Sequence, residues 1–289
     1  MSANPISAQP STDAQARKPG MSRTQKLLFF LTAWLICLMP FLFWWNTWFG
    51  RKLSDQQLNV YLHDTKKPRH IQQALVQVGE RITRREATAQ QWYPQLVQLA
   101  SDPVEEVRNT DAWVMGQDTS GAGFHEALLK MLSDPSQMVR GNAALSLVRF
   151  GDASGRAQIL SLLQPAIIDS SESGRIVDSD RPGTAIHQGG LIAKLQYGNK
   201  QTAEIRSPIP GRIRSVAGAG ANIAAGAEVA VIDPANEQVW EALRALYLIG
   251  QPDDLAAVRP YERDLPDISN DVRRQALETD QAIRNRSSR

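Results

Sequence analysis

The sequence is nearly free of cysteine and carries almost no excess charge of either sign. Its 289 residues include one cysteine, Cys37, so neither an internal disulfide nor a cysteine-based metal knuckle can form. The formal net charge of +2 is the balance of 32 basic and 30 acidic side chains. A dedicated nucleic-acid-binding protein needs a basic surface for its phosphate contacts. We therefore expect no nucleic-acid partner.

Motifs for catalysis and for metal or phosphate binding are also missing. The sequence has no G-x-S-x-G nucleophile motif, and its glycine-rich run 218–226 lacks the Gly-Lys-Ser/Thr ending of a phosphate loop. The histidines are not spaced like ligands of one metal ion; they are His63, His70, His125 and His187. We expect a protein that is not an enzyme and that binds no cofactor or metal.

One apolar run stands out near the N-terminus. Residues 27–50 carry no formal charge and read LLFFLTAWLICLMPFLFWWNTWFG. A helix of about 20 apolar residues can cross a hydrocarbon core of ~30 Å. Trp44, Trp45 and Trp48 gather at one end of the run, where indole rings favour a membrane interface. This pattern predicts a single transmembrane helix over residues 27–49, after a polar, disordered tail over 1–26.

The orientation of this predicted helix is only weakly indicated. Basic residues precede it, but Arg51 and Lys52 follow it at once, so the positive-inside rule separates the two sides poorly. We predict a cytoplasmic tail and a periplasmic soluble domain, in the inner (cytoplasmic) membrane of a bacterium. A cleaved signal peptide is not favoured, because the run is long and no small-x-small site follows it.

A repeat of 32 residues follows in the soluble part. Ser-Asp-Pro at 101–103 and Val-Arg at 107–108 recur at 133–135 and 139–140, with apolar residues at helical spacing around them. The pattern predicts pairs of helices joined by sharp Asp-Pro turns.

Two residue types recur within this pattern, and each has a structural interpretation. We interpret Asp102 and Asp134 as helix N-caps rather than as paired catalytic carboxylates. Arginine recurs at one place in the repeat, as Arg108, Arg140 and Arg273. We expect these arginines to bond one repeat to another rather than to bind a ligand.

The stretch LLKMLSDPSQMVRGNAALSLVRFGD at 128–152 resembles the HEAT-like repeats of the phycobilisome-lyase type, in which paired helices stack into a solenoid. The resemblance implies HEAT-like repeats over residues 60–164, continued over 233–289 together with a C-terminal tail. Solenoids of this kind present extended surfaces to protein partners.

The third copy of the repeat is interrupted. Its first helix is expected at 159–163, but the next Asp-Pro comes only at 233–234. From there the second helix extends 17 residues to Gly250, the same spacing as from Asp134 to Gly151. About 67 residues are therefore inserted between the two helices of one repeat.

The insert, residues 165–232, has the short β-branched runs, glycines and prolines of an all-β segment. It also repeats itself at an offset of 37. The matching pairs are Gly174/Gly211, Ile176/Ile213, Gly183/Gly220, Ile186/Ile223, Gly189/Gly226, Ile192/Val229 and Leu195/Ile232.

This duplicated pattern, and above all EIRSPIPGRIRSVAGAGANIAAGAEVAVI at 204–232, resembles the biotinyl/lipoyl domain, a flattened barrel of two pseudo-symmetric halves. It is also similar to the module of membrane-fusion (periplasmic adaptor) proteins of the hemolysin-secretion type. The resemblance implies an inserted barrel-sandwich domain. The fold class expected for the whole chain is α+β multidomain, with a transmembrane helix, an α-solenoid and this barrel.

In biotin and lipoate carriers the modified lysine lies at the tip of the hairpin between the halves. Lys200 lies at or beside this position here, within the tight turn 197–202. Its neighbours Asn199 and Gln201 match neither carrier's signature, so we interpret Lys200 as a solvated turn residue. Together with Tyr197, these turn residues are candidates for contact with a partner.

Trp113 and Trp240 occupy second-helix positions of different repeats, and if exposed they would anchor a peptide partner. We predict a membrane-anchored scaffold or adaptor that organises a cell-envelope export or secretion complex, with a homo-oligomer as a further expectation. One alternative is a carrier modified at Lys200 with biotin or lipoate. Another is a lyase- or chaperone-like HEAT-repeat protein.

Overall fold

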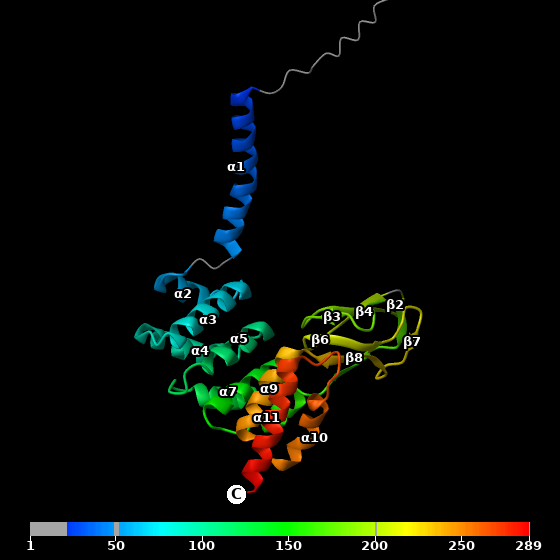
Figure 1. Cartoon of the computed structure of the whole chain (residues 1–289). Coiled ribbons are helices and arrows are strands. Elements are labelled where there is room, and N and C mark those ends of the chain that lie inside the picture. The colour runs from blue at the N-terminus through cyan, green and yellow to red at the C-terminus, as the bar shows by residue number, and fades with distance from the viewer. Residues whose placement is uncertain (1–21, 49–51, 200, 289) are drawn as a thin grey trace, which may run out of the picture. The chain divides into compact units, whose positions relative to one another are not determined.

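The computed structural model describes residues 22–48, 52–199 and 201–288. The chain divides into two units, Met1–Lys52 and Leu53–Arg289. In the first unit the structure describes one helix, α1 (Arg23–Trp48), which contains Pro40. The second unit combines a series of helices with two β-sheets (Figure 1).

The predicted transmembrane helix is wrong. Among the residues that the structure describes, no helix has both the length and the apolarity needed to cross a membrane. The same finding overturns the predicted localisation as a single-pass inner-membrane protein with a periplasmic domain.

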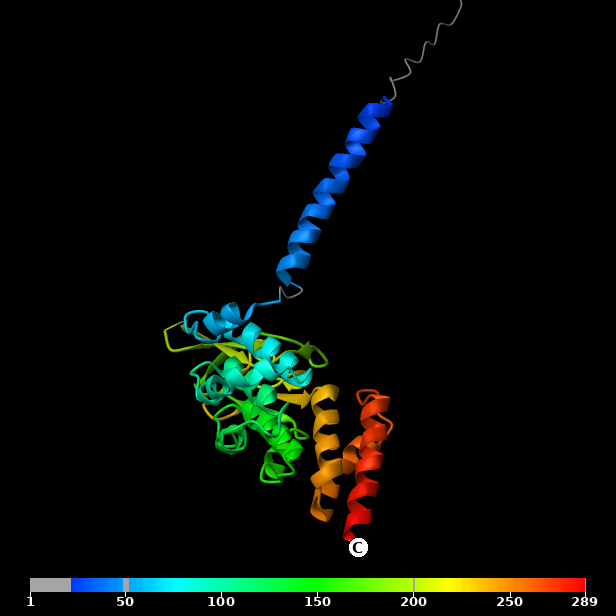
Figure 2. The ribbon, with the colours of Figure 1, turned by 90° about the vertical axis from the view of Figure 1, so that its left-hand side faces the viewer.

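Long and short helices alternate through the second unit. The long helices α3, α5, α7, α9 and α11 pack each against the next (Figures 1 and 2). The helices are α2 (Asp55–Leu62), α3 (Pro68–Thr83), η1 (Ala87–Trp92), α4 (Tyr93–Leu99), α5 (Glu105–Met115), α6 (Phe124–Met131), α7 (Gln137–Arg149), α8 (Arg156–Ser161), α9 (Asn236–Ile249), η2 (Pro252–Asp254), α10 (Leu255–Val258), η3 (Arg259–Glu262) and α11 (Asn270–Ser287).

Small residues and hydroxyls let the long helices approach closely. Ser146 Oγ on α7 donates a hydrogen bond of 2.8 Å to the carbonyl of Ala112 on α5. Thr279 Oγ1 on α11 donates one of 3.0 Å to the carbonyl of Leu243 on α9. A side chain at Gly116, just after α5, would overlap Ser146. Each buried hydroxyl therefore has a backbone partner, as a buried polar group requires.

The Asp-Pro turns differ in detail from their predicted geometry. Asp102 Oδ1 accepts a hydrogen bond from the Val104 amide and Asp134 Oδ1 accepts one from the Ser136 amide, both at 2.8 Å. The N-cap residues of α5 and α7 are Val104 and Ser136 themselves. The N-cap interpretation of the two aspartates is therefore wrong. Each carboxylate closes a turn two residues before the N-cap, as Asp side chains commonly do.

Helix α7 takes part in three apolar clusters. Its Ala143 and Leu147 belong to a cluster with residues of α2–α6, and Ala144 and Val148 belong to one with residues of α8–α11. Met138, also on α7, packs against the cluster between the β-strands. The helical layers and the sheets are thus joined through one helix.

The β-strands form two four-stranded antiparallel sheets, in the orders β1-β8-β6-β3 and β5-β4-β2-β7. They lie between α8 and α9 in the sequence, although these two helices pack against each other. The strands are β1 (Ala166–Asp169), β2 (Gly174–Ser179), β3 (Ala185–Ile186), β4 (Leu191–Tyr197), β5 (Gln201–Arg206), β6 (Gly211–Val216), β7 (Asn222–Ile223) and β8 (Glu228–Pro234).

The predicted biotinyl/lipoyl-like barrel is wrong, because the strands form two separate sheets with edge strands and not a closed barrel. The duplicated glycines and aliphatic residues determine where the chain turns and which residues face the core. Two facing sheets and a closed barrel satisfy that pattern equally well. Two edge strands, β3 and β7, are only two residues long. The observed fold class is helical repeats with two antiparallel sheets.

The internal duplication of the sheets is visible strand by strand. The strands β6, β7 and β8 begin 37 residues after β2, β3 and β4, respectively. Ile176 lies opposite Leu195 in one sheet, and Ile213 lies opposite Ile232 at the same offset in the other. Both pairs are buried in the common core. The repeated sequence therefore forms two copies of one strand arrangement.

Gly211 at the start of β6 provides a stability prediction. A Cβ at this position would overlap the backbone carbonyl of Asp233 on the paired strand. Since backbone cannot move aside cheaply, we expect Gly211→Ala to lower the free energy of unfolding by about 1–3 kcal/mol. Thermal unfolding measures the loss. The control is Gly218→Ala, where no atom lies within 4 Å of the new methyl group. Equal melting temperatures for the two variants would contradict the prediction.

Candidate functional site

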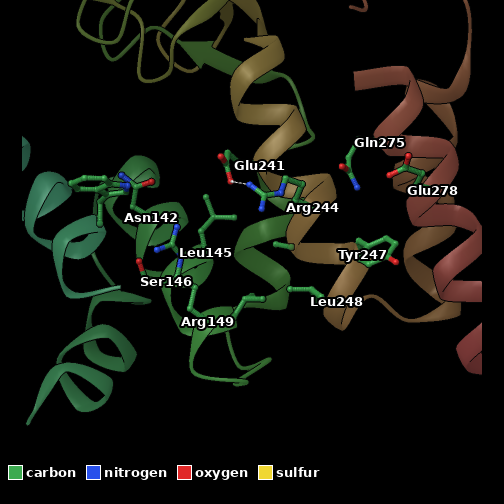
Figure 3. Close-up of a pocket in the computed structure, with 13 residues that line it drawn as sticks. Asn142, Leu145, Ser146, Arg149, Glu241, Arg244, Tyr247, Leu248, Gln275 and Glu278 are labelled. Carbon is green, nitrogen blue, oxygen red and sulfur yellow. Dashed lines mark ion pairs between the residues drawn. The ribbon is translucent and has the colours of Figure 1, made fainter. Parts of the chain in front are cut away.

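A groove of about 520 Å³ lies along the second helices of successive repeats. Its residues come from the C-terminal half of α5 and from α7, α9 and α11 (Figure 3). We call this surface the groove. It is lined by Trp113, Asn142, Leu145, Ser146, Val148, Arg149, Glu241, Arg244, Ala245, Tyr247, Leu248, Gln275 and Glu278.

Helical spacing explains why these residues share one surface. On α7, Asn142, Leu145 and Arg149 are three and four residues apart, so they lie on one face of the helix. Ala143 and Leu147 lie between them in sequence and are fully buried. Helix α9 repeats the arrangement with its own lining residues. The amphipathic helices thus bury their small and aliphatic faces and leave polar and aromatic side chains on the groove.

Large apolar side chains are exposed in the groove. Trp113 and Tyr247 are each 43% exposed, and Leu248 is 61% exposed. Exposure of neighbouring large apolar groups is unfavourable in water and marks a surface suited to a partner. Trp240 is half-buried, and the Arg244 guanidinium lies 4.6 Å from the centre of its ring. Of the two predicted tryptophans, only Trp113 lines the groove.

Amide side chains lie beside these aromatics. Asn142 Nδ2 on α7 donates a hydrogen bond of 2.8 Å to Asn109 Oδ1 on α5. This bond fixes the orientation of both amides across two repeats. Gln275 adds a third amide on α11. Such groups both donate and accept hydrogen bonds, as the main chain of a polypeptide does.

Charged side chains complete the lining. Arg149 Nη1 donates to the carbonyl of Gly116 at 3.3 Å and to Gln117 Oε1 at 2.9 Å. Arg244 and Glu241 on α9 form an ion pair at 3.8 Å. Within the described part of the chain, no ion pair involves Arg149 or Glu278. The groove therefore has unpaired charges of both signs.

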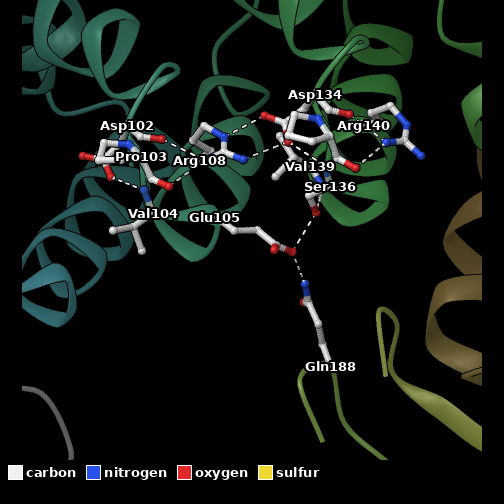
Figure 4. Close-up of polar contacts among 11 residues, drawn as sticks. Asp102, Pro103, Val104, Glu105, Arg108, Asp134, Ser136, Val139, Arg140 and Gln188 are labelled. Carbon is white, nitrogen blue, oxygen red and sulfur yellow. Dashed lines mark hydrogen bonds and ion pairs between the residues drawn. The ribbon is translucent and has the colours of Figure 1, made fainter. Parts of the chain in front are cut away.

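A second polar cluster joins the repeats away from the groove (Figure 4). Arg108 binds both carboxylate oxygens of Asp134 in the next repeat, at 2.6 and 2.9 Å. Burial raises the pKa of Asp134, but hydrogen bonds from Arg108 and from the Ser136 amide outweigh it and hold this pKa below its ordinary value. The expected bond between repeats is confirmed for Arg108.

The two other recurring arginines bond differently. Arg140 Nη1 donates to the carbonyls of Asp134 and Pro135 in its own turn, at 2.7 and 2.9 Å. Arg273 pairs at 3.2 Å with Asp264, in the loop before its helix. For these two residues the expected bond to another repeat is wrong. The inserted sheets interrupt the third copy, where Arg140 would otherwise meet the next Asp-Pro turn.

The same cluster connects the repeats to the sheets. Glu105 on α5 accepts hydrogen bonds from Ser136 Oγ at 2.7 Å and from Gln188 Nε2 at 2.6 Å. Gln188 lies between β3 and β4 (Figure 4). One carboxylate thus connects two repeats to the inserted sheets, residues 166–234, which we call the β module.

The hairpin residues that were predicted to contact a partner lie outside the groove. Tyr197 on β4 pairs with Gln201 on β5, and Asn199 is exposed between them. Lys200 lies outside the described residues. None of the described hairpin residues lines the groove. Of the predicted candidates that the structure describes, Trp113 lines the groove, whereas Trp240 and the hairpin residues do not.

Comparison with known proteins gives a family match to part of this surface. A family model described as "HEAT repeat" matches residues 126–154, which include most of α6 and all of α7. The chain is a helical repeat protein. The predicted HEAT-like resemblance is confirmed for this stretch, whereas nothing supports the biotinyl/lipoyl resemblance.

Solved structures similar to this repeat protein include two designed armadillo repeat proteins. One, YIII(Dq)4CqI, is 14% identical with a TM-score of 0.40. The other, YIII(Dq.V1)4CPAF in complex with the peptide (KR)4, is 15% identical with a TM-score of 0.39. Each comparison covers 78% of this chain and 80% of the other. No curated protein sequence matches the chain.

Several groove residues of the repeat protein escaped sequence reasoning, among them Asn142, Arg149, Arg244 and Tyr247. A signal for them does exist. Placing each second helix on a helical wheel, with its buried alanine and leucine facing inward, points these side chains to the opposite surface. A helical wheel does not show which helices pack beside one another.

Among the described residues, no group of three or more histidines, cysteines and acidic residues has a geometry that could hold a metal ion. Two histidines instead form single contacts with a carboxylate. His70 Nδ1 lies 2.8 Å from Asp64 Oδ2, and His125 Nε2 lies 2.8 Å from Asp152 Oδ2. These pairs connect neighbouring parts of the helical layers.

Proposed function

We propose that this helical repeat protein is an interaction scaffold that binds an extended polypeptide segment in the groove, and that it is not an enzyme. The observation that carries the proposal is the exposure of Trp113 and Tyr247 on a surface formed by consecutive second helices. Stacked repeats give an elongated surface, which suits an elongated ligand.

The chemistry of the lining supports a polypeptide. Aromatic side chains contribute large contact areas and have few rotatable bonds to immobilise on binding. The amides of Asn142 and Gln275 can pair with main-chain N–H and C=O groups of an extended segment, whatever its sequence. The groove therefore combines apolar anchors with groups that recognise a backbone.

Loss of the exposed indole should abolish most of this binding. We expect Trp113→Ala to weaken peptide affinity by at least about tenfold, since tryptophan is among the residues that contribute most to interface energies. The probe is the tightest 12-residue peptide selected from a displayed random library on the full chain, measured by fluorescence anisotropy.

The matched control for this substitution is Ile167→Ala. Ile167 is 64% exposed on β1, outside the groove, so its truncation should leave the affinity unchanged. The proposal would be contradicted if Ile167→Ala weakened peptide binding as much as Trp113→Ala does. It would also be contradicted if Trp113→Ala bound the peptide with unchanged affinity. Either result would show that the peptide binds outside the groove.

A further inference from the structure

The unpaired charges of the groove lie on different helices. Arg149 is an exposed residue of α7, and Glu278 is an exposed residue of α11. Helix α9 packs between these two helices, and its charged residues Glu241 and Arg244 form a pair with each other. Figure 3 shows the same order, from Arg149 through the α9 pair to Glu278. The lining is therefore neutral overall but polar along its length.

The charges of Arg149 and Glu278 are available to pair with a ligand. Among the described residues, the hydrogen bonds of the Arg149 guanidinium go to the neutral oxygens of Gly116 and Gln117. Glu278 forms no ion pair within the described part of the chain. A bound segment can thus place an acidic group beside Arg149 and a basic group beside Glu278. Between them lie the apolar side chains Leu145 and Leu248.

We propose that the groove selects a charge-segregated segment, with an apolar centre, an acidic residue on the α7 side and a basic residue on the α11 side. This inference rests on the proposed function, since it names the partner of the same groove. Complementary charges mainly provide specificity. A segment with two acidic flanks would gain the contact with Arg149 but would meet Glu278, and a segment with two basic flanks would meet Arg149.

The test compares four peptides that share the apolar core of the selected peptide. Two have one acidic and one basic flank, in either order, because the groove charges do not specify the chain direction. One has two acidic flanks and one has two basic flanks. In low-salt buffer we expect the better mixed peptide to bind the full chain about three- to tenfold more tightly than either single-sign peptide. This advantage should shrink in high salt.

Charge reversals in the protein sharpen the test. Glu278→Lys should shift the preference to the peptide with two acidic flanks, and Arg149→Glu should shift it to the peptide with two basic flanks. The controls Glu228→Lys and Arg181→Glu make the same changes in the β module, where both residues are exposed. These controls should leave the preference for the mixed peptide unchanged.

The outcomes separate the two proposals. If all four peptides bind equally and the reversals in the groove change nothing, the charge-selection proposal is overturned while binding in the groove stands. If none of the peptides depends on Trp113, the groove proposal fails, and the charge proposal fails with it. If the control reversals changed the peptide preference as much as the groove reversals do, the net charge of the protein, and not the groove, would determine which peptide binds best.

Discussion

Replacing Asp111 by alanine should stabilise the protein by about 1–3 kcal/mol at pH 7, the usual cost of a buried polar group without a hydrogen bond. Asp111 on α5 is fully buried, and within the described structure neither of its carboxylate oxygens has a hydrogen-bond partner. One repeat later, 32 residues on, the corresponding residue is Ala143, which is also fully buried. Alanine therefore fits this kind of position.

The stabilisation by Asp111→Ala should increase as pH rises. Burial, with a smaller contribution from the charge of Asp102, raises the pKa of Asp111 well above its ordinary value. Above about pH 4 the unfolded chain releases this proton while the native state retains it. The free energy of unfolding therefore falls as pH rises from about 4 towards the native pKa. Asp111→Ala should remove this fall, so its advantage over the wild type should grow with pH.

Urea unfolding at pH 5 and pH 8 measures both effects. The reciprocal substitution Ala143→Asp places a carboxyl group at the equivalent buried position and should destabilise the protein. An Asp111→Ala variant that is less stable than the wild type at both pH values would show that Asp111 makes a favourable buried interaction. That result would contradict the assignment of Asp111 as an unpaired group.

Truncation of Arg108 should have the opposite effect, a loss of about 3–5 kcal/mol. The side chains of Arg108 and Asp134 are only 12% and 7% exposed, and they share two hydrogen bonds. Arg108→Ala would leave the Asp134 carboxylate buried without its partner cation. Removal of one member of such a pair is costly even where the intact pair contributes little.

Arg140 provides a matched control for this loss. Like Arg108, it donates from Nη1 to two carbonyls of its own Asp-Pro turn, but among the described residues no carboxylate pairs with it. Arg140→Ala should therefore cost only about 1 kcal/mol. Denaturant unfolding compares the two variants. Equal losses would mean that the turn carbonyls, and not Asp134, account for the contribution of the arginine.

The pH profile gives an independent check on the same pair. Because the native pKa of Asp134 is lowered, its contribution to stability is complete above the unfolded pKa of about 4. It is lost as pH falls through the lowered native value. Arg108→Ala should weaken this acid-side dependence, whereas Arg140→Ala should largely retain it.

Local sequence patterns predicted much of the fold because they determine local structure. The spacing of the two Asp-Pro motifs indicates the paired helices around Asp102 and Asp134, and the offset of 37 indicates the duplicated strands. Closure of the sheets was not predictable in this way. It depends on whether edge strands meet, and the alternation of residues within each strand is the same in both cases.

The errors at single residues have a similar origin. An aspartate before proline can cap a helix or close the preceding turn, and only the position of the Ser136 amide shows that Asp134 does the latter. The groove depends on contacts between helices that are far apart in the sequence. The residue type of Trp113 marks it as a candidate, whereas no local pattern indicates that Arg149 and Glu278 share one surface.

The insertion between α8 and α9 has a consequence for the order of folding. These helices belong to one repeat, yet residues 162–235 separate them along the chain. Closing so long a loop costs chain entropy. When β1 pairs with β8, Ala166 is placed opposite Ile232 and only a few residues remain free on either side. Once the sheets have folded, the end of α8 and the start of α9 are therefore held close together. If the sheets form first, the loop that must close to complete the third repeat is therefore much shorter.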